Sequence, residues 1–153
     1  SAAARVETKE FRAGIIQLQT ELQLSPAVVV VLMSNNSAAA RVELPTFRAA
    51  LALLQRHVGD GGLVCLMRAN NVFCSRIDHE FVGHLIRIAV HVARYGFDAG
   101  RTMHTLLGKS APVMTKVNAL ADHVVQLDQE GIRQYVGSMR GTIAHRRQMA
   151  DKL

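Results

Sequence analysis

The feature of this chain that most constrains its fold is an internal repeat. Residues 1–13 read SAAARVETKEFRA and residues 37–49 read SAAARVELPTFRA, which agree at ten of thirteen positions with an offset of 36. A fainter third copy follows, in which Asn70-Asn71 and residues 76–81 echo Asn35-Asn36 and residues 41–47 with one residue fewer. A cloning duplication would explain the first two copies but not the diverged third. The repeat therefore predicts about three similar helix-turn-helix units.

Apolar residues at helical spacing predict a helix after the Phe of each unit. The helix that begins near Phe47 should end at Gly59, and the one that begins near Glu80 should stop near Gly96. The opposite side of the second helix carries His84, Arg87, His91 and Arg94. Two more apolar stripes, at residues 113–127 and 132–143, predict a helical pair at the C-terminal end.

The predicted fold is a mainly α single domain over residues 1–153. Its repeat units span approximately residues 1–24, 25–60 and 61–96, and the C-terminal helical pair spans residues 110–152. Two apolar runs leave an alternative open, because runs this short cannot be assigned by periodicity. Residues 27–42 and 63–77 are either short β-hairpins, with Val28 to Val31 as a β-branched strand, or short helices. We favour helices.

Composition excludes several classes of protein. With 49% apolar and 20% charged residues, the chain is globular rather than disordered. The longest uncharged run, residues 22–40, has its apolar centre only at residues 27–33, which is too short to cross a membrane. Cys65 and Cys74 lie among apolar residues, which predicts buried, reduced thiols and an intracellular, reducing location.

One family resemblance rests on three residue groups: Val6 with Glu10-Phe11, Val42 with Thr46-Phe47, and Ile77 with Glu80-Phe81. Their pattern resembles the degenerate EF-hand repeats of the calmodulin superfamily, in which a hydrophobic residue at loop position 8 precedes a closing acid-aromatic pair. The resemblance covers about two thirds of the chain. It implies a hand that does not bind calcium, because the loop that begins at Asn35 has one carboxylate, Glu43, and Thr46 in place of the bidentate Glu.

The resemblance implies a groove that binds a partner's amphipathic helix. We therefore predict a non-enzymatic interaction or assembly subunit, whose partner is another protein or a second copy of the chain. The predicted partner-binding residues are Leu51, Leu54, Leu85 and Ile88. No cofactor, metal ligand or catalytic residue is predicted, since the two Cys residues lack zinc-knuckle spacing and no phosphate loop or nucleophile motif is present.

The charge of the chain supports an alternative function. The net charge is +6, and Arg, whose planar fork suits phosphate, outnumbers Lys among the 18 basic residues. With 5% aromatic residues and no Trp, stacking on bases is disfavoured and contact with the backbone is left. The alternative is a nucleic-acid-binding coat protein or nucleoprotein, with candidate phosphate contacts at Arg87, Arg94, Arg140, Arg146 and Arg147. The competing interpretation is that these arginines only belong to the ordinary solvent-exposed side of their helices.

Overall fold

The described part of the chain is helical. The computed structural model describes the backbone of residues 2–35, 38, 41–42, 44–69, 73–108 and 116–151, and the side chains of those ranges between residues 9 and 140. In chain order the helices are α1 (Ala2–Leu22), α2 (Pro26–Met33), α4 (Pro45–Ala69), α5 (Phe73–Arg76), α6 (His79–Arg94), α7 (Ala99–Leu107), α9 (Val117–Val124) and α10 (Gln129–Asp151). The predicted mainly α class is confirmed. The hairpin alternative is wrong, since its described residues contain no strand.

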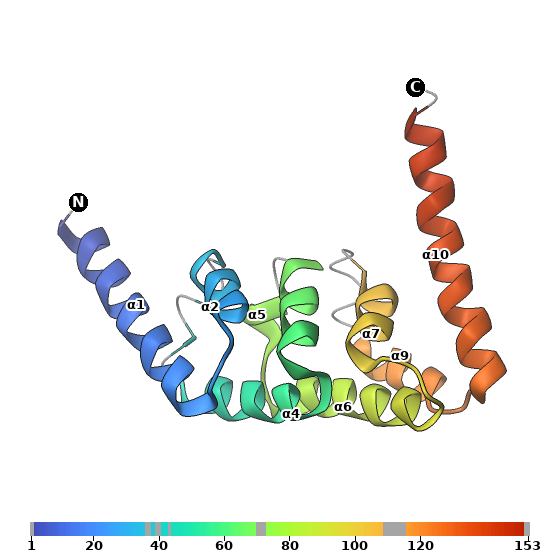
Figure 1. Cartoon of the computed structure of the whole chain (residues 1–153), viewed down its shortest axis with the longest axis horizontal. Helices are drawn as coiled ribbons and strands as arrows, with labels where there is room; N and C mark the ends of the chain where they lie inside the picture. The colour runs from blue at the N-terminus through green and yellow to red at the C-terminus, as the bar shows by residue number, and fades with distance from the viewer. Residues whose placement is uncertain are drawn as a thin grey trace.

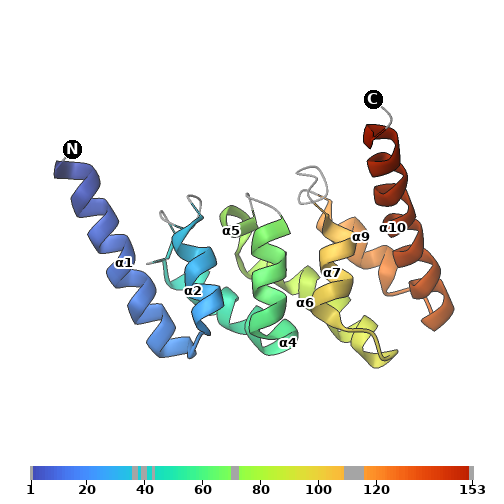
Figure 2. The ribbon, with the colours of Figure 1, turned by 45° about the horizontal axis from the view of Figure 1, so that its top comes forward.

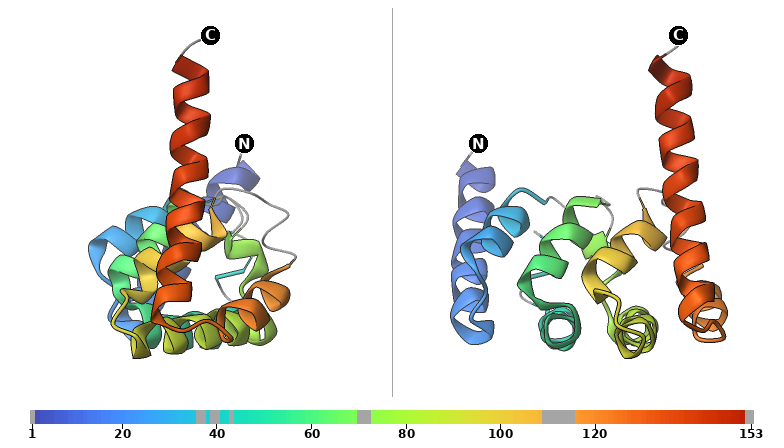
Figure 3. Two further views of the ribbon diagram at one scale, coloured as in Figure 1. Left: turned by 90° about the vertical axis from the view of Figure 1, so that its right-hand side faces the viewer. Right: turned by 45° about the vertical axis from the view of Figure 1, so that its right-hand side comes forward.

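The helices are arranged as a row of pairs (Figure 1). Gly59 interrupts α4 with non-helical angles, so residues 45–58 and 60–69 form two parts that point in different directions. The second part of α4 lies between α2 and α7, and α7 contacts α10 (Figure 2). In the right-hand view of Figure 3, the first part of α4 and α6 lie side by side, seen end-on below that row. The result is an elongated stack in which each pair packs mainly on its neighbours, as in α-solenoids.

Left-handed residues end the first helix of three successive pairs. They are Gln23 (φ 54°), Gly59 (φ 72°) and Gly96 (φ 87°), which are 36 and 37 residues apart. After α6 the Gly96 N–H donates to the Ala93 carbonyl at 3.0 Å and the Phe97 N–H to the Val92 carbonyl at 3.1 Å, which is a Schellman ending. A left-handed residue at this spacing turns the chain back at the same place in each pair.

Side-chain caps start the helices that follow these turns. The Ser25 side chain accepts from the Val28 N–H, and Pro26 occupies the first turn of α2, where no N–H is needed. Asp98 accepts from the Arg101 N–H at the start of α7, and Asp128 from the Gly131 N–H at the start of α10, both at 2.8 Å. The cap and Pro26 explain why the β-branched run at residues 28–31 is helical.

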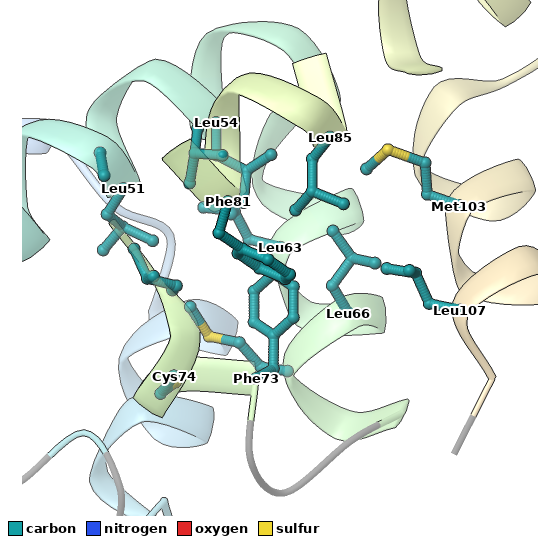
Figure 4. Packing of buried hydrophobic residues seen from close by; sticks show 14 of the residues in the cluster. Leu51, Leu54, Leu63, Leu66, Phe73, Cys74, Phe81, Leu85, Met103 and Leu107 are labelled. Carbon is teal, nitrogen blue, oxygen red and sulfur yellow. The ribbon is translucent and has the colours of Figure 1, made fainter. Parts of the chain in front are cut away.

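The core is continuous along the stack. Phe47 and Phe81 stand at matching places, two residues after the starts of α4 and α6, and are 1% and 4% exposed. Phe81 meets Phe73 edge to face, with ring centroids 5.7 Å apart. Figure 4 shows these two rings grouped with Leu54, Leu63 and Leu85 from α4 and α6. The helices predicted from the stripes after Phe47 and Glu80 are therefore confirmed.

Two copies of one segment differ in structure. Residues 2–7 lie within α1, which runs unbroken through Val6, Glu10 and Phe11, so the loop end expected there from the EF-hand resemblance is absent. In the second copy Arg41 and Val42 lie in a turn. Pro45 explains the difference, because proline disfavours the helical conformation of the residue before it and lacks the N–H that a continuing helix needs. The third expected loop begins at residues 70–72, which are outside the described residues.

The C-terminal part of the fold differs from the prediction in two ways. α7 was not predicted, because its nine residues begin with Ala99-Gly100 and show only a short apolar pattern. The predicted helical pair at residues 110–152 exists as α9 and α10, but α9 begins at Val117, and residues 109–115 are outside the described residues. The extra helix α7 pairs with α6.

A close contact between glycines joins α4 to α7, and it gives a stability test. A Cβ on Gly100 would lie 2.7 Å from the Gly62 Cα, whereas a Cβ on Gly83 of α6 would have no neighbour within 4 Å. We expect Gly100→Ala to lower the free energy of unfolding by about 1–3 kcal/mol, because backbone must move. Gly83→Ala should raise it by about 0.5–1 kcal/mol by favouring the helix. Urea denaturation measures both, and a Gly100→Ala variant as stable as the parent would contradict the close crossing.

Candidate functional site

The predicted partner-binding residues do not form an open groove. Leu51, Leu54, Leu85 and Ile88 are all 0% exposed. The apolar stripes of α4 and α6 face each other in neighbouring pairs, so each stripe is the other's partner (Figure 4). A partner helix cannot contact these four side chains while the chain keeps this fold, and the prediction of a groove at these residues is therefore wrong.

Most acidic side chains with a described position are used within the fold. Asp78, Asp98 and Asp128 accept backbone N–H bonds in the first turns of α6, α7 and α10. Asp60 accepts from the Ser25 N–H at 2.7 Å and from the Gln55 amide at 2.9 Å. Carboxylates at helix N-termini are partly neutralised by the positive end of the helix dipole. The negative potential that they produce close to these helix ends is therefore weaker than that of an isolated carboxylate.

Three arginines have acidic partners. Arg48 pairs with Glu21 of α1, Arg87 pairs with Asp122 of α9 at 2.8 Å, and Arg133 pairs with Glu130 three residues before it at 2.6 Å. The last two pairs are exposed, and exposed pairs contribute about 0–1 kcal/mol each. The acidic partners offset the charge of Arg87 and Arg133 but hold these two side chains only weakly.

Other arginines are exposed and, among the residues whose side chains are described, have no acidic partner. They are Arg12, Arg56, Arg68, Arg76, Arg94, Arg101 and Arg140. Arg94 and Arg140 are two of the five predicted phosphate contacts. Of the other three predicted contacts, Arg87 has an acidic partner, and the side chains of Arg146 and Arg147 lie outside the described residues. The five remaining exposed arginines were not predicted, although Arg12 and Arg68 have no acidic residue three or four positions away in the sequence.

The basic side of α6 forms a crevice with the end of α9. Ile86, Arg87, Val90, His91, Arg94 and Val125 line a hollow of about 400 Å³. The His91 Nε2 lies 2.7 Å from the Leu127 carbonyl oxygen, which can only accept, so this nitrogen carries the proton. The Tyr95 ring also packs edge to face with the His91 ring, with the ring centroids 5.2 Å apart. The structure thus brings Arg87, His91 and Arg94 together, while Arg140 lies on another helix, α10.

The short helix α2 carries two of the exposed large apolar side chains of the described residues, and the others, Ile16, Leu44 and Val90, lie outside it. All eight of its residues are apolar, and Val30 and Met33 are 58% and 40% exposed. A helix that is apolar all round is usually covered on every side. The side of α2 that faces away from the core therefore resembles a contact surface more than a solvated one.

The thiols and acids are the remaining groups that could hold a metal ion or act as nucleophiles. No group of three or more His, Cys, Asp or Glu that could hold an ion occurs in the part of the chain that the structure describes. Cys65 and Cys74 are both free, and Cys74 is buried. Burial raises the pKa of Cys74 to about 12, although Arg41 acts in the opposite direction. Cys74 is therefore a poor nucleophile at neutral pH.

Comparisons with known proteins add no assignment. No family model, curated protein or solved structure matches this chain. Within its described residues, the chain has no helix with the length and apolar character that a membrane span requires. The EF-hand resemblance stays a prediction.

Proposed function

We propose that this protein is a non-enzymatic scaffold that binds the backbone of a nucleic acid through arginine side chains. The observation that carries the proposal is an imbalance between the two kinds of charge. The described carboxylates mostly cap helices or pair with Arg48, Arg87 and Arg133, whereas seven other arginines are exposed without an acidic partner among the described residues. Such a surface attracts a polyanion.

Two further observations support this function over a groove for a partner helix. The side chains that would line the groove are 0% exposed. The stack of helix pairs is elongated, and extended stacks present long surfaces that suit extended ligands. Arg is also suited to phosphate because its planar fork donates two parallel hydrogen bonds.

The test is direct binding of a fluorescently labelled, random-sequence 12-nucleotide single strand, followed by anisotropy at 50 mM salt. We expect a dissociation constant in the micromolar range or below, as for sequence-independent binding through phosphates. Removal of three unpaired charges, in the triple variant Arg68→Gln, Arg101→Gln and Arg140→Gln, should weaken binding and reduce the steepness of log affinity against log salt by up to about 2 on a single strand.

The control is Arg133→Gln, whose arginine already has an acidic partner in Glu130. This variant also lowers the net charge by one, so we expect it to weaken binding, but less than Arg68→Gln, Arg101→Gln or Arg140→Gln does alone, because a phosphate must displace Glu130 to reach Arg133. If the triple variant binds as tightly as the parent, or if the parent does not bind at 50 mM salt, the proposed function is wrong.

The exposed side of α2 favours a second candidate function, which is assembly with a second copy of the chain. It is supported by the exposure of Val30 and Met33 on a helix with no polar residue. Sedimentation equilibrium of the parent and of Val30→Lys distinguishes this candidate. Association that the substitution removes would favour assembly, and a monomeric parent at 100 μM, roughly the concentration at which a weak homodimer is populated, would exclude it.

A further inference from the structure

The crevice between α6 and α9 combines cationic and apolar groups in one small hollow. Arg87 and Arg94 are exposed, Val90 is 40% exposed, and the half-buried Ile86 and Val125 complete the apolar part. Its volume of about 400 Å³ is near the lower end of the range for ligand sites, which is about 300–1,000 Å³. The hollow is open to solvent and therefore has room for one nucleotide-sized group of a strand that continues beyond it.

We propose that this crevice seats one nucleotide unit of the bound nucleic-acid strand. Arg94 and Arg87 contact its phosphate, and Val90, Ile86 and Val125 contact the apolar side of its sugar. The inference rests on the proposed function and specifies where on the surface the strand is held. Apolar residues beside the arginines distinguish this ligand from a free phosphate ion, which is fully hydrated and gains nothing from them.

Asp122 limits the strength of this site. Its Oδ1 lies 2.8 Å from the Arg87 Nη2, with the two side chains 64% and 42% exposed. An ion pair this exposed is weak, so a phosphate can displace the carboxylate from Arg87. On binding, the phosphate then takes the place of Asp122 at Arg87, and the two negatively charged groups lie close together. Removal of the negative charge at residue 122 should therefore strengthen strand binding.

His91 fixes the geometry of the crevice. Its ring bridges the two helices, because Nε2 donates to the Leu127 carbonyl at the turn after α9 while the ring itself belongs to α6. The Gln129 amide adds a second link by donating to the Tyr95 carbonyl at 3.1 Å. These bonds connect the C-terminal part of α6, which carries Arg94, to the turn between α9 and α10, which follows Val125.

Two matched pairs of variants test the site, with the labelled 12-nucleotide strand at 50 mM salt as the probe. Asp122→Asn and Glu130→Gln each remove one negative charge and free one arginine, but only Asp122 pairs with an arginine that lines the crevice. We expect Asp122→Asn to raise affinity about two- to fivefold and Glu130→Gln to change it less. Arg94→Gln should lower affinity about tenfold, and Arg12→Gln, which removes an exposed arginine on α1, should lower it less.

The outcomes separate the crevice from the general function. If the two variants of each pair change the affinity equally while the parent still binds the strand, the proposed nucleotide site in the crevice is wrong and nucleic-acid binding elsewhere on the surface stands. Absence of strand binding by the parent would overturn both. Inorganic phosphate should displace the strand no better than chloride of equal ionic strength. A specific effect of phosphate would show that the crevice holds a free anion, which would also overturn the inference.

Discussion

Truncation of Phe47 to Ala should lower the free energy of unfolding by about 3–5 kcal/mol, the usual effect of removing a buried aromatic ring. Phe47 is 1% exposed and lies in the first turn of α4, within the core that joins α4 to α6 and α2. Because small domains are stable by about 5–15 kcal/mol, this single change removes a large share of the margin. Urea denaturation followed by circular dichroism measures the loss.

Two other Phe residues provide the comparison. Phe81→Ala should have a similar effect, because Phe81 is 4% exposed and meets Phe73 edge to face. Phe11→Ala should have a smaller one, since Phe11 is only partly buried on α1 at the end of the stack. If Phe47→Ala unfolds at the same urea concentration as the parent, the packing of α4 described above is wrong.

Native Cys74 should react with iodoacetamide at pH 8 at least about tenfold more slowly than the same thiol in the unfolded chain. Burial raises its pKa from 9.0 to about 12, so the reactive thiolate is much rarer, and access is blocked as well. Cys65 is only partly buried and should react first. Mass spectrometry of peptides after timed labelling measures both rates. Equal labelling of Cys74 in native and unfolded protein would contradict its burial.

The same pKa shift gives a dependence of stability on pH. The thiol of Cys74 ionises above pH 9 in the unfolded chain but only near pH 12 in the folded protein. Its contribution to stability is therefore complete below pH 9 and is lost as the pH rises from 9 to 12, by up to about 1.4 kcal/mol per pH unit. The loss should be smaller in Cys74→Ala, and an identical alkaline decline in both proteins would contradict the shift.

Local signals in the sequence were sufficient to predict much of the helical structure. The stripes after Phe47 and Phe81 and the ends at Gly59 and Gly96 depend on residues within one helix, and the structure confirms them. Arg5 and Val6 lie within α1 whereas their copies Arg41 and Val42 lie in a turn, and this difference is also local, because Pro45 follows only the second copy. The short helix α7 escaped prediction because nine residues hold too little pattern.

The candidate site could be predicted only in part, because it depends on which elements meet. The stripe of His84, Arg87, His91 and Arg94 was visible by helical spacing, but its contacts with Asp122 and the Leu127 carbonyl join residues 35 and 36 positions apart. The error over Leu51, Leu54, Leu85 and Ile88 has the same origin. An apolar stripe predicts burial, and only the packing of α4 on α6 shows that the chain itself provides the cover.

The most direct test of nucleic-acid binding through arginine is the affinity of the parent protein for the labelled 12-nucleotide strand between 50 and 200 mM salt. Binding through phosphates releases counterions, so log affinity should fall linearly with log salt. If about six phosphates are contacted, the slope is roughly −4 on a single strand and the affinity falls several-hundred-fold over this range. An affinity that stays constant across the range, or no binding at 50 mM salt, would contradict a function based on the unpaired arginines.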